Sequence, residues 1–128
     1  MTGAWWDYVD PIAAVGTFLT TQRPVAEPMI RQWSLRENIW MRRTAILAQL
    51  KCKKATDPHL IFDCIRPSMT STEFFLQKAI GWSLHEHSKT EPGQVVGFVS
   101  DNSDELSNLS KREGLKTLLQ SGVVESIP

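Results

Sequence analysis

Helix start signals recur along the whole of this 128-residue chain, and alternating strand patterns are almost absent from it. The signals are cap residues, prolines in a first turn, and capping boxes in which Ser or Thr is followed three residues later by Glu. Only residues 94–99 also fit a strand, and their neighbours favour helix. The pattern predicts an all-α chain of about seven helices. The expected helices cover about 6–20, 25–35, 39–50 and 58–65, and a further helix opens at the box Thr70–Glu73 and reaches about 88. The start and stop signals are Asp7, Asn38, Asp57–Pro58, the boxes Thr70–Glu73 and Ser110–Glu113, Thr90–Pro92 and Gly122.

A weak internal repeat spaces similar helical segments about 35 residues apart. IWMRRTAIL, from Ile39, aligns with FFLQKAIGW, from Phe74, so that Arg43 falls on Lys78, and 34 further residues lead to Arg112. Helical pairs at this period are typical of a HEAT-like or ARM-type α-α solenoid, in which the second helix of each pair lines the concave face. We therefore predict one such domain over residues 1–128, with the three cations in a row. The competing interpretation is a set of unrelated surface cations.

Composition and charge narrow the class of protein. The chain has 41% hydrophobic and 22% charged residues, as an ordinary folded domain does. Its 14 basic and 14 acidic residues cancel, so any binding of nucleic acid must rely on a local basic stripe. There is no apolar run of membrane-spanning length, no signal-peptide pattern, and no CxxC motif around Cys52 or Cys64. We expect an intracellular protein with reduced thiols, in either nucleus or cytoplasm.

Four stretches, in order, resemble the C-terminal half of the AlkD-type DNA alkylation repair proteins. They are WWDYVD at 5–10, NIWMRRTAILAQL at 38–50, EFFLQKAIGWSLHEHSKT at 73–90 and LSKREGLK at 109–116. The resemblance implies a HEAT-like DNA glycosylase that removes positively charged N3- and N7-alkylated purines from double-stranded DNA. It also implies that the damaged nucleotide stays within the duplex, unlike the base flipping of most glycosylases.

The resemblance also assigns site residues. It makes Asp10 the catalytic carboxylate, places Trp6 against the deoxyribose, brings Arg43 to the DNA backbone and makes Trp82 a further wall of the site. Three more cations would extend the contact with phosphates: Lys78, Lys111 and Arg112.

The chemistry of the reaction calls for these residue types. A cationic alkylpurine is already a good leaving group, and bond cleavage moves positive charge onto the sugar. A nearby carboxylate and an indole face both stabilise that charge. Trp6 and Asp10 are four residues apart, so on a helix they share one face. Such a site needs no metal and no organic cofactor.

The remaining aromatic and histidine residues receive less specific predictions. Trp33, Trp40 and the pair Phe74–Phe75 are expected to pack between helices. His85 and His87 are two residues apart and do not share a helical face, so we expect no joint metal site. The resembling proteins usually have Arg and Tyr at these places, and a neutral histidine binds phosphate more weakly than arginine does.

The family has a further block of helices before the WWD motif, whereas here the motif follows Met1 closely. We therefore expect a chain truncated at its N-terminus relative to the family. Its first helix would then expose Ile12, Val15 and Leu19, which a second copy or a partner could cover. Two functions compete on this basis: an active DNA glycosylase, and a catalytically weak HEAT-like module that binds DNA or protein.

Overall fold

The computed structural model describes residues 14–52 and 55–128, and all regular structure in these two ranges is helical. The predicted all-α class is confirmed, and the ambiguous segment 94–99 lies inside a helix. In chain order the elements are a helix over 14–21, α2 (Arg23–Trp33), α3 (Ile39–Leu47), α4 (Pro58–Ile65), the 3-10 helix η2 (Arg66–Ser68), α5 (Phe74–Ser88), α6 (Pro92–Asp101) and α7 (Asn108–Gln120).

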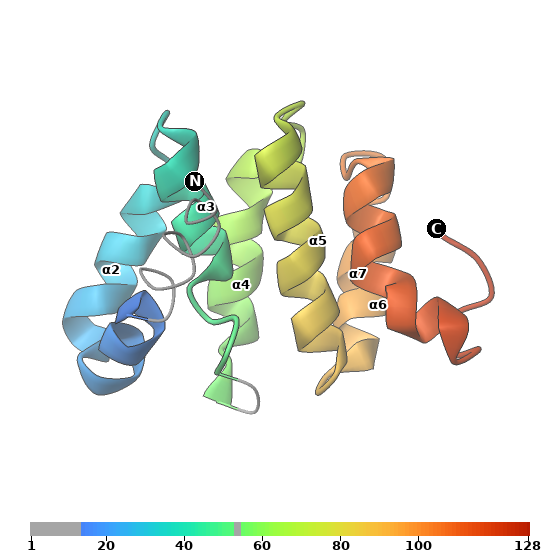
Figure 1. Cartoon of the computed structure of the whole chain (residues 1–128), viewed down its shortest axis with the longest axis horizontal. Helices are drawn as coiled ribbons and strands as arrows, with labels where there is room; N and C mark the ends of the chain where they lie inside the picture. Colours follow the sequence, from blue (N-terminus) through green and yellow to red (C-terminus); the bar gives the residue numbers. More distant parts are fainter. Residues whose placement is uncertain (1–13, 53–54) are drawn as a thin grey trace, which may run out of the picture.

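The helices follow one another along the long axis of the molecule, from α2 at one end to α7 at the other (Figure 1). Helix α5 packs against both α3 and α7, so these three helices form one row. Helix α2 packs against α3 and α4, and α6 packs against α5 and α7. The three cations that the repeat aligned lie one on each helix of the row: Arg43 on α3, Lys78 on α5 and Arg112 on α7.

Two of the predicted caps are confirmed by their hydrogen bonds. The Asn38 side chain accepts from the backbone N–H groups of Trp40 and Met41, at 2.9 and 3.2 Å, and so opens α3. The Asp57 carboxylate accepts from the backbone N–H of His59 at 2.9 Å and opens α4. Each cap satisfies N–H groups that have no partner within the first helical turn.

Both predicted capping boxes are wrong. The cap of α7 is Ser107, whose side chain accepts from the backbone N–H of Ser110 at 3.0 Å, so the helix starts three residues earlier than the box predicts. The Ser110 hydroxyl instead donates to the carbonyl of Gln77 in α5, at 2.9 Å. Helix α5 begins after Glu73, whose side chain makes no capping bond. The signal that ends α7 is confirmed, since Gly122 has φ +80° just beyond the last turn.

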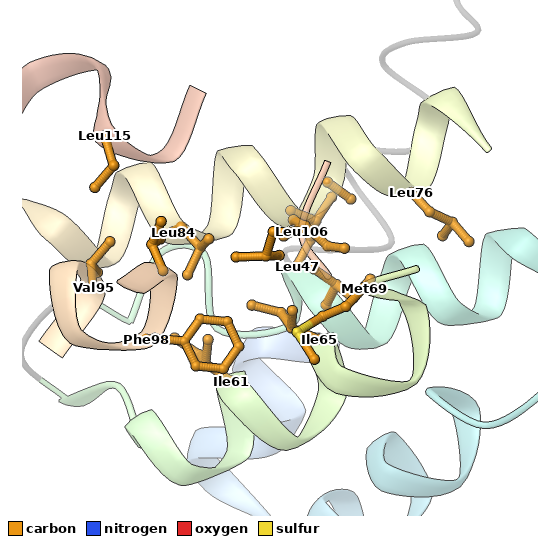
Figure 2. Packing of buried hydrophobic residues seen from close by; sticks show 14 of the residues in the cluster. Leu47, Ile61, Ile65, Met69, Leu76, Leu84, Val95, Phe98, Leu106 and Leu115 are labelled. Carbon is orange, nitrogen blue, oxygen red and sulfur yellow. The ribbon is translucent and has the colours of Figure 1, made fainter. Parts of the chain in front are cut away.

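A core lies between the row α3–α5–α7 and the helices that cover it. Side chains from five helices and from the segments beside them converge in the larger of two clusters (Figure 2). Each fully buried aliphatic side chain stabilises the fold by about 1.5–3 kcal/mol. The most enclosed members include Leu47, Ile65, Ile80, Leu84, Val95, Val99 and Leu115.

A smaller cluster closes the end of the molecule beside α2, and it corrects one prediction. Leu19 is only 2% exposed, and Val15 packs against the same cluster as Leu19 and Ile30. The exposed apolar face that the sequence analysis expected on the first helix is therefore absent at these two residues, because α2, α3 and α4 cover them. Ile12 lies outside the described residues.

A chain of ion pairs joins α2 to α4 on the surface. Arg31 reaches Asp63 at 2.6 Å and Glu27 at 3.1 Å, while Arg23 pairs with both Glu27 and Asp57. Hydrogen bonds from Arg31, and then from Arg23, hold the pKa of the Glu27 carboxyl below its usual value. The outer faces of these two helices are thus linked by charge as well as by packing.

Both cysteines are free thiols, as predicted. Cys64 is buried in the smaller cluster, where desolvation raises the pKa of its thiol to about 11. Among the described helices, none combines the length and the apolar character that crossing a membrane requires.

Candidate nucleic-acid interface

A groove of about 450 Å³ lies on the row formed by α3, α5 and α7. Helix α3 supplies Arg43, α7 supplies Glu113 and Lys116, and α5 supplies the remaining lining residues. Three residues that the sequence analysis singled out are therefore brought together here: Arg43, Lys78 and Trp82. The α5 lining consists of Phe74, Phe75, Lys78, Ala79, Gly81, Trp82 and His85.

The two consecutive arginines of α3 have different surroundings. Arg42 donates from Nη1 to the carbonyl of Pro67 at 3.0 Å and to the hydroxyl of Ser68 at 3.3 Å, and from Nε to the carbonyl of Arg36. These bonds tie the start of α3 to η2. Arg43, in contrast, is half-buried and lines the groove. The arginine that the resemblance assigned to the DNA backbone is thus the one that faces the groove.

Trp82 has one side in the core and another in the groove. It packs as a partly buried residue against the larger cluster, and its α5 neighbours Ile80 and Leu84 are fully buried. Packing of this kind holds the indole in one position before any ligand arrives. Trp82 therefore lies both against the core and on the groove.

Two glycines let α5 and α7 approach closely beneath the groove. A Cβ placed on Gly81 would lie 2.6 Å from the Cβ of Glu113, and one placed on Gly114 would lie 3.0 Å from the Cβ of Leu84. Neither glycine has the left-handed backbone conformation, so the close approach of the helices is what requires them. This approach sets the spacing between the α5 and α7 walls of the groove.

An ion pair spans these two walls. The ammonium of Lys78 lies 2.7 Å from a carboxylate oxygen of Glu113, and this hydrogen bond holds the pKa of the Glu113 carboxyl below its usual value. Beside the pair, Nε2 of His85 lies 2.8 Å from the hydroxyl oxygen of Thr117. The groove lining within the described ranges thus has three permanent cations and one carboxylate, which leaves it positive overall.

The prediction that Trp40, Phe74 and Phe75 pack between helices is wrong for the two phenylalanines, and Trp40 is also exposed, although its ring contacts Phe75 of α5. Phe74 is 55% exposed, Phe75 is 47% exposed, and Trp40 is 37% exposed. The three rings contact one another instead, with centroids 5.3 Å apart for Trp40 and Phe75 and 5.7 Å apart for the two phenylalanines. Phe74 and Phe75 lie in the first turn of α5 and line the groove instead of the core. Trp33 packs against the smaller cluster, as predicted.

The cations of α7 are arranged differently from the prediction. Lys111 is only 8% exposed, and its ammonium donates to the carbonyl of Ser103 at 3.0 Å, so it ties α7 to the segment before it. Arg112 is exposed but does not line the groove, whereas Lys116 does. Lys116 follows Arg112 by one helical turn, and this i,i+4 spacing was the sequence signal that could have found it.

Of the other residues that the sequence analysis discussed, two lie outside the described residues, His85 lines the groove and His87 does not. Asp10 and Trp6 belong to residues 1–13, which are not described. His85 faces α7, while the buried His87 has its Nε2 2.8 Å from an amide oxygen of Gln94 in α6. The two histidines therefore point to different helices, as their spacing predicted.

Comparisons with known proteins identify the family. The chain's sequence finds no significant match among curated proteins. The family model of the DNA alkylation repair enzymes matches residues 1–118. A solved structure, described as a predicted DNA alkylation repair enzyme from Enterococcus faecalis, is 39% identical and superposes with a TM-score of 0.77. The likeness covers 91% of this chain and 55% of that chain, so this chain spans about half the length of its neighbour. The chain belongs to the DNA alkylation repair enzyme family.

Proposed function

We propose that this chain excises positively charged N3- and N7-alkylated purines from duplex DNA by hydrolysing the N-glycosidic bond. The supporting observation is a groove, in a member of the alkylation repair family, that combines the indole of Trp82 with the cations Arg43, Lys78 and Lys116. Cations bind the phosphates on either side of a nucleotide, and an indole face attracts positive charge on the sugar between them.

The reaction needs little from the protein beyond electrostatics. The alkylated purine carries a positive charge, so its bond to the sugar can break with both electrons moving to the ring nitrogen, and the base leaves neutral without protonation. The sugar becomes oxocarbenium-like. In this proposal the Asp10 carboxylate and the indoles of Trp6 and Trp82 stabilise that cation. Water then adds to the anomeric carbon, its proton passes to Asp10 or to solvent, and an abasic site remains.

The phosphate contacts follow from where the cations lie. Arg43 can offer a fork of N–H donors to one phosphate, and Lys78 and Lys116 can offer point charges on the two walls of the groove. Arg112, exposed one turn before Lys116, would extend the row. Lys111 is left out of this set because it is buried on Ser103. We further propose that residues 1–128 act as one HEAT-like domain, with this row as its DNA-binding face.

The test is release of base from a defined duplex. The chain is incubated with double-stranded DNA that carries a single 7-methylguanine, and free base and abasic sites are measured. We expect release by the wild-type chain and by Cys52→Ala, and loss of release in Asp10→Asn. The cysteine variant is the matched control, since Cys52 lies away from the groove.

Three results would go against the proposal. Release that persists in Asp10→Asn would remove the carboxylate from the mechanism. Binding that depends on salt but yields no base would support the alternative function, a catalytically weak HEAT-like module that binds DNA. If the chain neither binds DNA nor releases base, a module that binds protein is the remaining interpretation.

A further inference from the structure

Exposed aromatic rings lie beside the cations of the groove in a repeated arrangement. Trp40 precedes Arg43 by three residues on α3, and Phe75 precedes Lys78 by three residues on α5. Residues three apart on a helix are neighbours on its surface. The ring of Trp40 contacts that of Phe75, so the two pairs lie side by side at the same end of the row. Phe74 adds a third ring and is the most exposed of them, at 55%.

This cluster of rings, Trp40–Phe74–Phe75, is unusual for a surface. Large aromatic side chains normally lose most of their exposure on folding, because burial in the core stabilises them. Here the first turns of α3 and α5 hold the rings outward, and Phe74 and Phe75 also line the groove. The rings are therefore continuous with a surface whose other members include the cations Arg43 and Lys78.

The neighbouring charges indicate what such rings contact. A protein partner would meet a cationic rim, whereas nucleic acid offers both a charged backbone and flat bases. Phosphates satisfy cations, and the π-face of a base stacks on an aromatic ring or admits it as a wedge between base steps. A ring three residues before a cation lies about one helical turn, roughly 5 Å, from it. At that distance the cation can contact a phosphate of the backbone while the ring contacts an adjoining base.

We propose that Phe74 and Phe75, supported by Trp40, contact the bases of the bound DNA beside the lesion, while the cation row holds its phosphates. The rings thus serve to position the damaged nucleotide and do not take part in the chemistry. This inference rests on the proposed function in one respect only, namely that the partner is duplex DNA. It does not depend on Asp10 or on base release.

The experiment uses a duplex that no glycosylase can cleave. It carries a tetrahydrofuran abasic analogue with 2-aminopurine at the neighbouring nucleotide, so that stacking changes the fluorescence of the probe. Affinity is measured by anisotropy over a range of salt concentrations for the full chain and for Phe74→Ala, Phe75→Ala, Lys116→Gln and Leu35→Ala. Leu35 is 66% exposed and lies outside the groove, so it is the matched control for removal of an apolar surface side chain.

Stacking and phosphate contacts give different signatures. Phe74→Ala and Phe75→Ala should each weaken binding by about tenfold and abolish the fluorescence change, with the salt dependence unaltered. Lys116→Gln should reduce the slope of log affinity against log salt by about one and keep the fluorescence change. Leu35→Ala should behave like the wild-type chain. Circular dichroism checks that each variant is folded.

Several outcomes overturn the inference. One is binding by Phe74→Ala and Phe75→Ala that equals that of Leu35→Ala. Another is a loss of affinity accompanied by a shallower salt dependence and an unchanged probe signal, which would make the rings' effect electrostatic. If the wild-type chain binds no DNA, the inference and the proposed function both fail. If the chain binds with these signatures but releases no 7-methylguanine, only the proposed function fails.

Discussion

Among the glycines that the structure describes, Gly81 is the one at which an added Cβ would come closest to another atom. A Cβ added here would lie 2.6 Å from the Cβ of Glu113 and 3.4 Å from the carbonyl oxygen of Ser110. In real structures a Cβ essentially never has a non-bonded contact shorter than 3.0 Å. The Cβ of Glu113 is fixed to the backbone of α7, so rotation of the glutamate side chain cannot relieve the clash. One helix has to move.

The size of the effect follows from two opposing contributions. Alanine is a better helix former than glycine by about 1 kcal/mol, which favours Gly81→Ala. Overpacking in a rigid contact costs about 1–3 kcal/mol, and the immobile Cβ of Glu113 places this case at the upper end. We expect the free energy of unfolding to fall by about 2 kcal/mol. For a chain of this size the midpoint of thermal unfolding should then drop by about 8 °C.

A second glycine provides the control. Gly97 lies inside α6, is exposed, and has nothing within 4 Å of the position that a Cβ would occupy. The substitution Gly97→Ala is chemically the same as Gly81→Ala but meets open space, so it should raise the free energy of unfolding by about 0.5–1 kcal/mol. Urea unfolding of both variants and the wild-type chain, followed by far-UV circular dichroism, measures the two changes side by side. If Gly81→Ala is as stable as Gly97→Ala, then α5 and α7 are not in the close contact described above.

Three further predictions concern charge and thiol chemistry. Glu113→Gln removes the carboxylate that pairs with Lys78, so affinity for duplex DNA should rise and its salt slope should steepen by about one; an unchanged slope would mean that Lys78 contacts no phosphate. The pKa of the Glu27 carboxyl is lowered in the folded chain, so the stability that this residue contributes is present above about pH 4.5 and is lost as the pH falls through the folded pKa. On acidification, the urea midpoint of Glu27→Gln should therefore fall less than that of the wild-type chain. In the folded chain a thiol reagent should label Cys52 and leave Cys64 unmodified, because the Cys64 thiol is buried and has a pKa of about 11. Equal labelling rates at the two cysteines would contradict this burial.

Much of the fold could be predicted because helix starts depend on local chemistry. Asn38 and Asp57 act as caps through their own side chains and the next few N–H groups, so the sequence alone was sufficient. The start of α7 was missed because two serines, Ser107 and Ser110, both offer a hydroxyl. The choice between them depends on Gln77 of another helix, whose carbonyl accepts from Ser110. A contact between helices that are distant in sequence cannot be read from a local pattern.

The candidate site was predicted less completely, for a related reason. The repeat correctly placed Arg43 and Lys78 on neighbouring helices of one row, because a period fixes which turn of each helix is aligned. The repeat could not show which side of α7 faces α5, so it selected Arg112, which does not line the groove, and missed Lys116. Lys111, which was expected beside Arg112 as a further phosphate contact, is instead buried on Ser103. The rotation of α7 about its axis depends on the close packing of Gly114 against Leu84 of α5. The sequence spacing of the cations carries no information about that packing.

Under the proposed function, selectivity for damage has to come from the groove and not from a strong hold on the DNA backbone. The chain has no net charge, and Glu113 neutralises Lys78 within the groove. Phosphate contacts are shared by intact and damaged DNA, and intact sites vastly outnumber lesions, so a large electrostatic contribution would mostly retain the protein on intact DNA. A paired Lys78 weakens that shared contribution. It leaves unchanged the attraction between an indole and a cationic sugar, which only the damaged nucleotide can develop. Partial neutralisation of the groove therefore shortens the residence time of the protein on intact DNA, and it does not weaken the interactions that favour reaction at a lesion.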